Sequence, residues 1–218
     1  MMSIEAKIAE IRANLQKNVK LVAISKTFPA EAILEAYSAG QRQFGESRPQ
    51  ELKTKSELLP KDIEWHMIGH LQTNKVRMIL PIVSIIESLN SRRLAEAIDR
   101  EAKKIDKTID CLLEIQLSDE DSKTGWDFTD LESFITDGGF SSLPNIRLRG
   151  VMGIATYSDS QEIVEADFRR LRSYFEQLAP IFGNQFDTVS MGMSSDYRLA
   201  MECGSTSVRV GSYIFGGR

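Results

Sequence analysis

The feature that most constrains this chain is the regular alternation of short apolar runs with segments of helical period. Apolar residues on consecutive positions, as at residues 83–86 and 112–113, are typical of strands buried on both faces of a parallel sheet. Between such runs, apolar residues recur every three or four positions, which indicates amphipathic helices. The expected strands are residues 19–25, 43–45, 63–68, 82–87, 108–116, 146–154, 186–190 and 207–210.

A helix is expected after every strand except the last, and one more before the first strand. The leading helix is indicated by Ile4, Ile8, Ile11 and Leu15, which lie on one face at helical spacing. The others are expected at residues 29–39, 49–58, 73–80, 90–105, 128–136, 162–178 and 195–202. Strict alternation of this kind permits a closed eight-stranded barrel or a doubly wound open sheet.

Two observations favour the barrel. The number of expected strands is eight, and the turn after the first strand, Lys26-Thr27-Phe28-Pro29, lacks the glycines of a dinucleotide-binding loop. A chain of 218 residues is long enough for one large domain that needs no disulfides or metals to be stable. We therefore predict an α/β fold, a single-domain (β/α)8 TIM-type barrel over residues 1–218 with an extra N-terminal helix.

Composition excludes several classes of function. With 42% hydrophobic and 27% charged residues, the chain is typical of soluble globular proteins. Its net charge of -4 and the absence of a dense basic cluster argue against nucleic acid as a partner. No apolar window is long enough for a membrane span, and the N-terminus lacks a signal core, so we expect a cytoplasmic protein. Cys111 and Cys203 show no paired spacing; a disulfide between them stays open.

The loops after the strands should carry the function, because active sites of barrels lie at the carboxyl ends of the strands. The seventh loop, residues 190–196, places Ser194 and Ser195 at the start of a helix, where an anion binds well. The eighth strand ends with Arg209 and Gly211, and the glycine would let the backbone approach a ligand closely. Loops seven and eight commonly bind phosphate in this fold. Simpler readings are a helix cap for the serines and a surface salt bridge for the arginine.

Barrel closure would bring Lys26 close to this expected anion site. Lys26 follows the first strand, and closure pairs the first strand with the eighth, which contains Arg209. A lysine at a strand end is either an ordinary solvated residue or an amine placed to react with a carbonyl. A ligand with a phosphate at one end and an aldehyde at the other would fit, and pyridoxal 5′-phosphate is the common cofactor of that shape.

Five ordered motifs resemble the pyridoxal-phosphate homeostasis proteins, single-domain relatives of the alanine racemase N-terminal barrel. The motifs are residues 22–27, 44–47, 65–75, 190–196 and 208–211, and the likeness covers nearly the whole chain. The resemblance implies that Lys26 holds the cofactor as a Schiff base and that further residues contact its phosphate and ring. Those residues are Ser194, Ser195, Arg209, Gly211 and Ser212. Likeness to the racemases suggests that Arg209 faces the pyridine nitrogen, but ring and phosphate both stay open for it.

Three more residues are weaker candidates for the same site. Ser47 stands where the family usually has asparagine, and its side chain is shorter with fewer donors. Met152 belongs to a stretch expected to place an apolar surface under the ring. His70 is either a loop residue near the cofactor or a packed polar side chain. With only His66 beside it and no further ligands at a suitable spacing, we expect no metal site.

Two functions from different classes follow. One is a non-catalytic protein that binds pyridoxal 5′-phosphate, buffers it and delivers it to apo-enzymes. The other is an amino-acid racemase, which needs acids or bases on both faces of the substrate. In the racemases the second-face tyrosine comes from an additional C-terminal β domain, and we expect none after residue 218. The binding protein is therefore favoured, with no catalytic residue and as a monomer, a weak dimer being the alternative.

Overall fold

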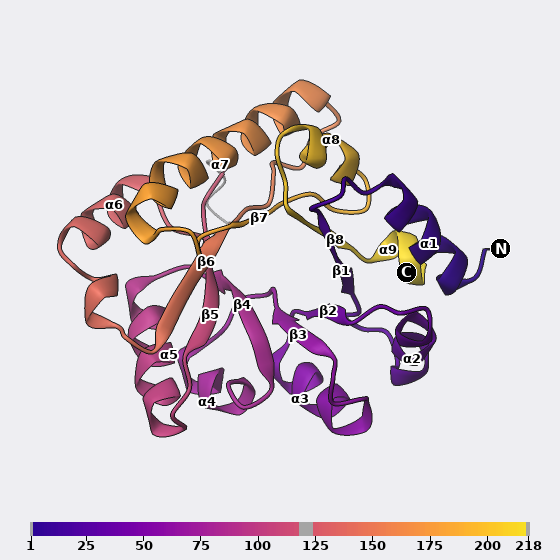
Figure 1. Cartoon of the computed structure of the whole chain (residues 1–218), viewed down its shortest axis with the longest axis horizontal. Coiled ribbons are helices and arrows are strands. Elements are labelled where there is room, and N and C mark those ends of the chain that lie inside the picture. Colours follow the sequence, from indigo (N-terminus) through magenta and orange to yellow (C-terminus); the bar gives the residue numbers. More distant parts are fainter. Residues whose placement is uncertain (1, 118–123, 217–218) are drawn as a thin grey trace.

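The eight strands form one closed parallel barrel in the computed structural model, which describes residues 2–117 and 124–216 (Figure 1). Neighbouring strands pair in chain order, and β1 closes the barrel by pairing with β8 through Val22 opposite Arg209. This confirms the barrel and rules out the open sheet. The strands are β1 Lys20–Ile24, β2 Gln43–Glu46, β3 Glu64–Met67, β4 Val83–Leu89, β5 Ile109–Glu114, β6 Ile146–Met152, β7 Thr188–Ser190 and β8 Ser207–Val210.

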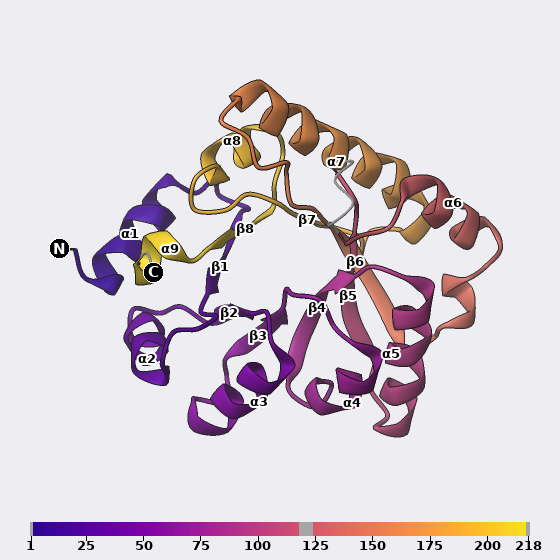
Figure 2. The same ribbon diagram turned by 180° about the vertical axis from the view of Figure 1, so that it is seen from behind.

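Helices surround the barrel on its outside (Figures 1 and 2). The α-helices are α1 Ile4–Asn14, α2 Ala30–Ser38, α3 Pro49–Leu58, α4 Val76–Ile79, α5 Arg92–Lys104, α6 Phe128–Thr136, α7 Gln161–Phe182, α8 Tyr197–Glu202 and α9 Ser212–Phe215, and the 3₁₀ turns are η1 Thr73–Lys75 and η2 Phe140–Ser142. The predicted N-terminal helix is confirmed as α1, and Ser3 is its N-cap, with a hydroxyl that accepts the Ala6 N–H. None of the helices in the described ranges is long and apolar enough to cross a lipid bilayer.

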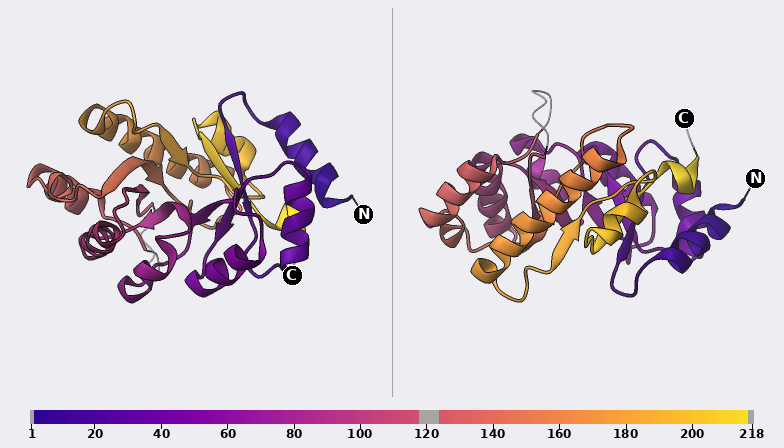
Figure 3. Two further views of the ribbon diagram at one scale, coloured as in Figure 1. Left: turned by 60° about the horizontal axis from the view of Figure 1, so that its bottom comes forward. Right: turned by 90° about the horizontal axis from the view of Figure 1, so that it is seen from above.

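The expectation that no helix follows the last strand is wrong. Helix α9 begins directly after Gly211 and ends at Phe215, so it is too short for a helical period to show in the sequence. It lies beside α1 (Figure 3), where Lys7 Nζ donates to the Ile214 carbonyl at 3.1 Å. The first and last helices therefore meet beside the seam where β1 and β8 close the barrel.

The outer face of the barrel packs against the helices mainly through apolar side chains. Phe44, Met67 and Ile86 of the strands are fully buried there, together with Phe168 of α7. Burial of this kind is the main favourable contribution to folding. Both cysteines are buried and free, which answers the question of a disulfide.

A bulge in β6 changes which side chains of that strand face the barrel interior. Cys111 of β5 is opposite Leu148, but the next residue, Leu112, is opposite Gly150, so Arg149 is the extra residue. Gly150 has φ +149°, and a Cβ there would lie 1.8 Å from the Thr188 carbonyl oxygen, so only glycine lets β6 and β7 approach this closely.

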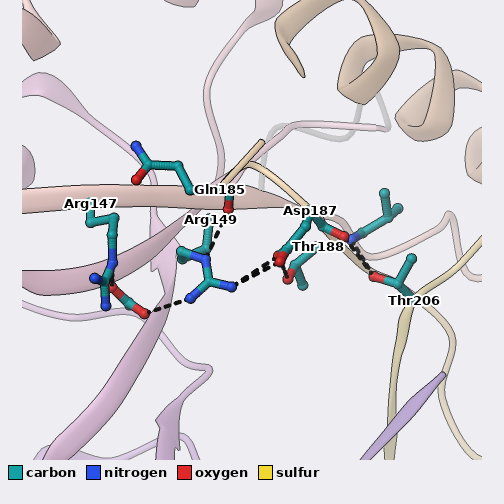
Figure 4. Close-up of polar contacts among 8 residues, drawn as sticks. Arg147, Arg149, Gln185, Asp187, Thr188 and Thr206 are labelled. Atoms are coloured by element: carbon teal, nitrogen blue, oxygen red, sulfur yellow. Dashed lines mark hydrogen bonds and ion pairs between the residues drawn. The ribbon is translucent and has the colours of Figure 1, made fainter. Parts of the chain in front are cut away.

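The extra residue ties three strands together (Figure 4). Its guanidinium donates to Asp110 of β5 at 3.1 Å and to Asp187, just before β7, at 2.9 Å. Because a bulge shifts the alternation by one residue, Leu148 and Val151 both pack in the apolar outer layer. Met152, at the end of the strand, then falls on the interior side.

Candidate functional site

Most of the predicted site residues line one cavity of about 320 Å³ at the carboxyl ends of β1 and β8. Its volume lies within the range of roughly 300–1,000 Å³ typical of small-molecule sites. Six of the nine candidate residues contribute to it, and apolar side chains complete the wall. The lining residues are Ile24, Lys26, Phe28, Met193, Ser194, Ser195, Arg209, Gly211, Ser212 and Gly216.

Lys26 lies at the mouth of this cavity with an exposed side chain. The chain leaves the sheet here: the Ser25 N–H still donates to the Gly45 carbonyl at 3.0 Å, and Thr27 then adopts a left-handed φ of 69°. The Lys26 amine has no hydrogen-bond or ion-pair partner within the described ranges. It is therefore free to meet a molecule that enters the cavity.

The loop between β7 and α8 forms the opposite wall. Gly192 has φ +93°, and a Cβ there would lie 2.5 Å from the Ala200 Cβ, so the turn requires glycine. Ser194 Oγ accepts the N–H of Gly211 at 3.2 Å and of Tyr213 at 3.4 Å. The serine thus joins loop seven to the start of α9, and it does not cap α8, whose N-cap is Asp196.

Free donors gather on the same wall. Across residues 2–117 and 124–216, the backbone N–H groups of Ser194, Ser195 and Ser212 have no acceptor. Unpaired backbone donors and serine hydroxyls in one concave wall suit an anion such as a phosphate. Gly211 also brings two parts of the protein close together. A Cβ there would lie 3.0 Å from both the Cβ and the carbonyl oxygen of Ile24, so the glycine allows loop eight to approach β1.

Arg209 points into the barrel, which excludes a surface salt bridge. Arg209 is 5% exposed, and its guanidinium donates to Ser190 Oγ at 2.7 Å and to the Gly153 carbonyl at 2.8 Å. Burial lowers the pKa of Arg209, although the nearby carboxylates of Glu87, Asp196 and Glu114 act in the other direction. Arginine nonetheless stays protonated in proteins. The cavity therefore has a permanent positive charge at its floor.

A buried carboxylate holds this arginine, and sequence reasoning missed it. Glu87 of β4 is 1% exposed; one oxygen lies 2.6 Å from His66 Nδ1 and the other accepts the Ser190 hydroxyl at 2.6 Å. Since β4 and β7 lie three strands apart, this bond crosses the barrel interior. Burial would raise the pKa of Glu87, but hydrogen bonds from His66 and Ser190 and the charge of Arg209 hold it below its ordinary value.

A second interior carboxyl group was also missed. Glu114, at the end of β5, accepts the Thr124 hydroxyl at 2.8 Å through one oxygen, while its other oxygen is buried without a partner in the described part of the chain. Burial raises the pKa of Glu114, against hydrogen bonds from Thr124 and Asn90. No sequence spacing marks either glutamate, because each only follows an apolar run.

The three remaining candidates lie outside the cavity. His70 is exposed and lines a separate cavity of about 430 Å³ with Gln72 and Asn90. Ser47 follows β2 and packs under Gly69, where a Cβ would lie 2.4 Å from the Ser47 carbonyl oxygen. Met152 is 1% exposed and lies level with Ser190 in the neighbouring strand. Within residues 2–117 and 124–216, no three His, Cys, Asp or Glu side chains are grouped to hold a metal ion.

The whole chain is similar in sequence to proteins of one family. The family described as "Alanine racemase, N-terminal domain" matches residues 1–218. The pyridoxal phosphate homeostasis protein of Pasteurella multocida is 36% identical, covering 100% of this chain and 98% of that protein. The protein of that name from Schizosaccharomyces pombe is 37% identical, covering 100% and 94%.

Solved structures agree with these sequence relatives. PipY of Synechococcus elongatus, whose structure has pyridoxal 5′-phosphate bound, superposes with a TM-score of 0.90 at 37% identity, covering 98% of this chain and 100% of that one. Alanine racemase of Bartonella henselae shares the fold at a TM-score of 0.73 and 16% identity, with 98% of this chain covering 58% of that enzyme. The chain therefore belongs to the pyridoxal phosphate homeostasis proteins, within the family of alanine racemase N-terminal domains.

Proposed function

We propose that this protein binds pyridoxal 5′-phosphate in the 320 Å³ cavity and takes part in keeping the supply of this cofactor steady. The observation that carries the proposal is that one small cavity is lined both by the Lys26 amine and by backbone N–H groups, none of which has a partner in the described part of the chain. An aldehyde and a phosphate on one molecule would satisfy both. The bound cofactor in PipY and the shared names of the relatives support it.

The residues divide the binding between them. The Lys26 amine would attach covalently to the aldehyde carbon as a Schiff base. Hydroxyl and backbone N–H groups of Ser194, Ser195 and Ser212 would donate to the phosphate oxygens. Gly211 would contribute the close approach of loop eight to β1.

Arg209 would face the ring, because its buried guanidinium donates to Ser190 and to the Gly153 carbonyl, and not to the loop that carries Ser194 and Ser195. Bound pyridoxal 5′-phosphate supplies an electrophilic carbon and an electron-withdrawing ring. A permanently charged donor at the ring nitrogen opposes protonation there and so weakens the ring as an electron sink.

We further propose that the protein has no catalytic cycle of its own. Racemisation requires a proton donor or acceptor on each face of the substrate. The described residues that line the cavity include Lys26 and Arg209 but no His, Tyr, Asp, Glu or Cys. Since arginine does not give up its proton, only Lys26 could act as a base there. We also propose that the protein delivers the cofactor to apo-enzymes, and that residues 1–218 form a single domain. The protein would act as a monomer in the cytoplasm.

The decisive experiment is the Lys26→Ala variant. Wild-type protein incubated with pyridoxal 5′-phosphate should turn yellow, and borohydride should fix the cofactor on the peptide that contains Lys26. The variant should lose the reducible adduct entirely. Lys20→Ala is the matched control, because Lys20 is an exposed lysine at the other end of the same strand.

Two results would overturn these proposals. A reducible adduct that persists in Lys26→Ala, mapped to another lysine, would remove Lys26 from the site. Sustained racemisation of L-alanine by the wild-type protein, lost in Lys26→Ala, would make the protein an enzyme. Transfer is tested by mixing the loaded protein with an apo-enzyme and following recovery of that enzyme's activity.

A further inference from the structure

A buried charged cluster of Lys55, Glu46 and Glu51 contacts the backbone on both sides of Lys26. Lys55 of α3 is 7% exposed, and its amine donates to three acceptors: Glu46 at 2.7 Å, Glu51 at 2.7 Å and the Ser25 carbonyl at 2.8 Å. Lysine is almost never buried without partners, and all three of its donors are used here. The ammonium group is therefore fixed in place by acceptors on β2, on α3 and on Ser25, the residue after β1.

The contacts of this cluster end on the two neighbours of Lys26. On one side, the Ser25 carbonyl accepts from Lys55 and the Ser25 hydroxyl donates to Glu46 at 2.6 Å. On the other side, the Thr27 N–H donates to Glu51 at 2.6 Å. Lys26 thus stands on a short backbone segment that is fixed at both ends, although its own side chain is free.

The turn itself needs such support. Thr27 has a φ of 69°, a left-handed conformation that is rare for a β-branched residue and persists only where surroundings enforce it. Glu51 makes the only side-chain hydrogen bond to the Thr27 backbone in the described part of the chain. If Thr27 relaxed to an ordinary φ, the chain direction would change one residue after Lys26 and the amine would leave its place at the cavity mouth.

The cluster is not the only attachment of α3 to the barrel. Leu52 of the same helix is fully buried, so apolar packing already anchors it. The cluster also carries a cost, since Glu46 has one buried oxygen without a partner across the described ranges. A charged group kept in such a position at a cost is typical of a functional requirement.

We propose that Lys55, Glu46 and Glu51 are positioning residues that fix the Lys26 turn so that the amine faces the aldehyde of the bound cofactor. The inference rests on the proposed function and deepens it, because it separates two steps. Ser194, Ser195 and Ser212 bind the phosphate, and the cluster sets how readily the Lys26 amine then attaches to the aldehyde. None of the three residues lines the cavity, so their effect passes through the turn.

The test compares Glu51→Ala with Glu51→Gln. Glu51 is at the edge of the cluster, and its removal leaves the Lys55–Glu46 pair in place. Glu51→Ala removes the acceptor of the Thr27 N–H, whereas Glu51→Gln keeps an oxygen at the same reach. Lys53→Met is the matched control, since Lys53 lies on the same helix in an exposed ion pair with Glu57.

Three measurements are made on each full-length protein. They are the rate of formation of the borohydride-reducible adduct, the affinity for pyridoxine 5′-phosphate, and hydrogen exchange at the Thr27 amide. Pyridoxine 5′-phosphate has an alcohol in place of the aldehyde and cannot attach to lysine. Glu51→Ala should slow adduct formation by about ten- to a hundredfold, as expected for a misplaced reacting group. Its affinity for the alcohol should stay within about twofold, and Thr27 exchange should accelerate. Glu51→Gln should restore most of the rate.

The outcomes are distinct. Adduct formation at the wild-type rate in Glu51→Ala, with faster Thr27 exchange, would overturn the positioning role. A parallel loss of adduct rate and alcohol affinity in both Glu51 variants would also overturn it, because the cluster would then serve folding alone. Failure of the proposed function would show instead in the wild-type protein, which would form no adduct at all.

Discussion

The inner and outer faces of the same eight strands are built from different chemistry. Outside, Phe44, Met67 and Ile86 pack against the helices among other apolar side chains. Inside, near the cavity, Glu87 and Arg209 face each other across the barrel through Ser190. Adjacent residues on one strand, such as Ile86 and Glu87, therefore stabilise the fold by different means.

This contrast between the two faces predicts which substitutions the fold tolerates. Apolar burial is non-directional and depends on volume, so the outer layer should accept repacking that conserves it. The inner network depends on hydrogen-bond geometry and on charge, and removal of one partner leaves another buried without compensation. The inner face should therefore respond to pH and to isosteric substitutions that leave the outer face unaffected.

The largest effect is expected at Glu87. In Glu87→Gln the size of the side chain is kept but the negative charge opposite Arg209 is lost. Breaking a buried pair in this way should lower the free energy of unfolding by about 3–5 kcal/mol, measured by urea denaturation. Glu64→Gln, at an exposed position of β3, is the control. A loss below about 1 kcal/mol would mean that the network contributes no more than a surface pair.

The effect of Glu87→Gln on the free energy of unfolding should also depend on pH. The pKa of Glu87 is held below its ordinary value in the folded state, so its contribution is present in full above the unfolded pKa of about 4.3. That contribution is lost as the pH falls through the folded value. The gap in unfolding free energy between wild type and Glu87→Gln should therefore be constant near neutral pH and narrow below about pH 4. A gap that widens in acid would contradict the assignment.

The outer face is tested by Ile86→Ala, one residue away. Ile86 is fully buried, and truncation to alanine should cost about 2–4 kcal/mol through lost apolar burial and the cavity left behind. Because no charge is involved, the loss should be the same at pH 4 and pH 7. If it varied with pH as Glu87→Gln does, the two faces could not be treated as independent.

The smallest effect is expected at the bulge in β6. Arg149 is 27% exposed and bridges Asp110 and Asp187 (Figure 4). Arg149→Met should lower the free energy of unfolding by about 1 kcal/mol, since partly exposed ion pairs are weak and screened by salt. The loss should shrink in 1 M salt. Arg92→Met, which breaks a more exposed pair with Glu96, should cost less.

The sequence was sufficient for the barrel because its signals are local. Each apolar run fell within a few residues of an observed strand, and closure could be inferred from the number of strands and from the missing glycine loop after the first strand. Lys26, Ser194 and Arg209 could be brought together for the same reason: the end of a strand fixes a position in a barrel. The six residues that share the cavity all belong to the loops or ends of β1, β7 and β8.

What the sequence could not show depends on contacts between distant elements. Glu87 and His66 are 21 positions apart in the sequence. Their contact depends on how β3 and β4 pair, and the register of that pairing shifts between Trp65 and His66. Lys55 looks like a residue of a solvated helix face, because burial of a lysine cannot be told from spacing. The placement of His70 in another cavity likewise depends on how its loop turns after β3.

The pairing of β1 with β8 also orders events during protein synthesis. Because a chain is made from its N-terminus, Lys26 is synthesised well before the strand that carries Arg209. The cavity needs both, so a nascent chain has no completed pocket, whatever the concentration of cofactor around it. Newly made protein thus starts empty and loads only after translation has passed β8.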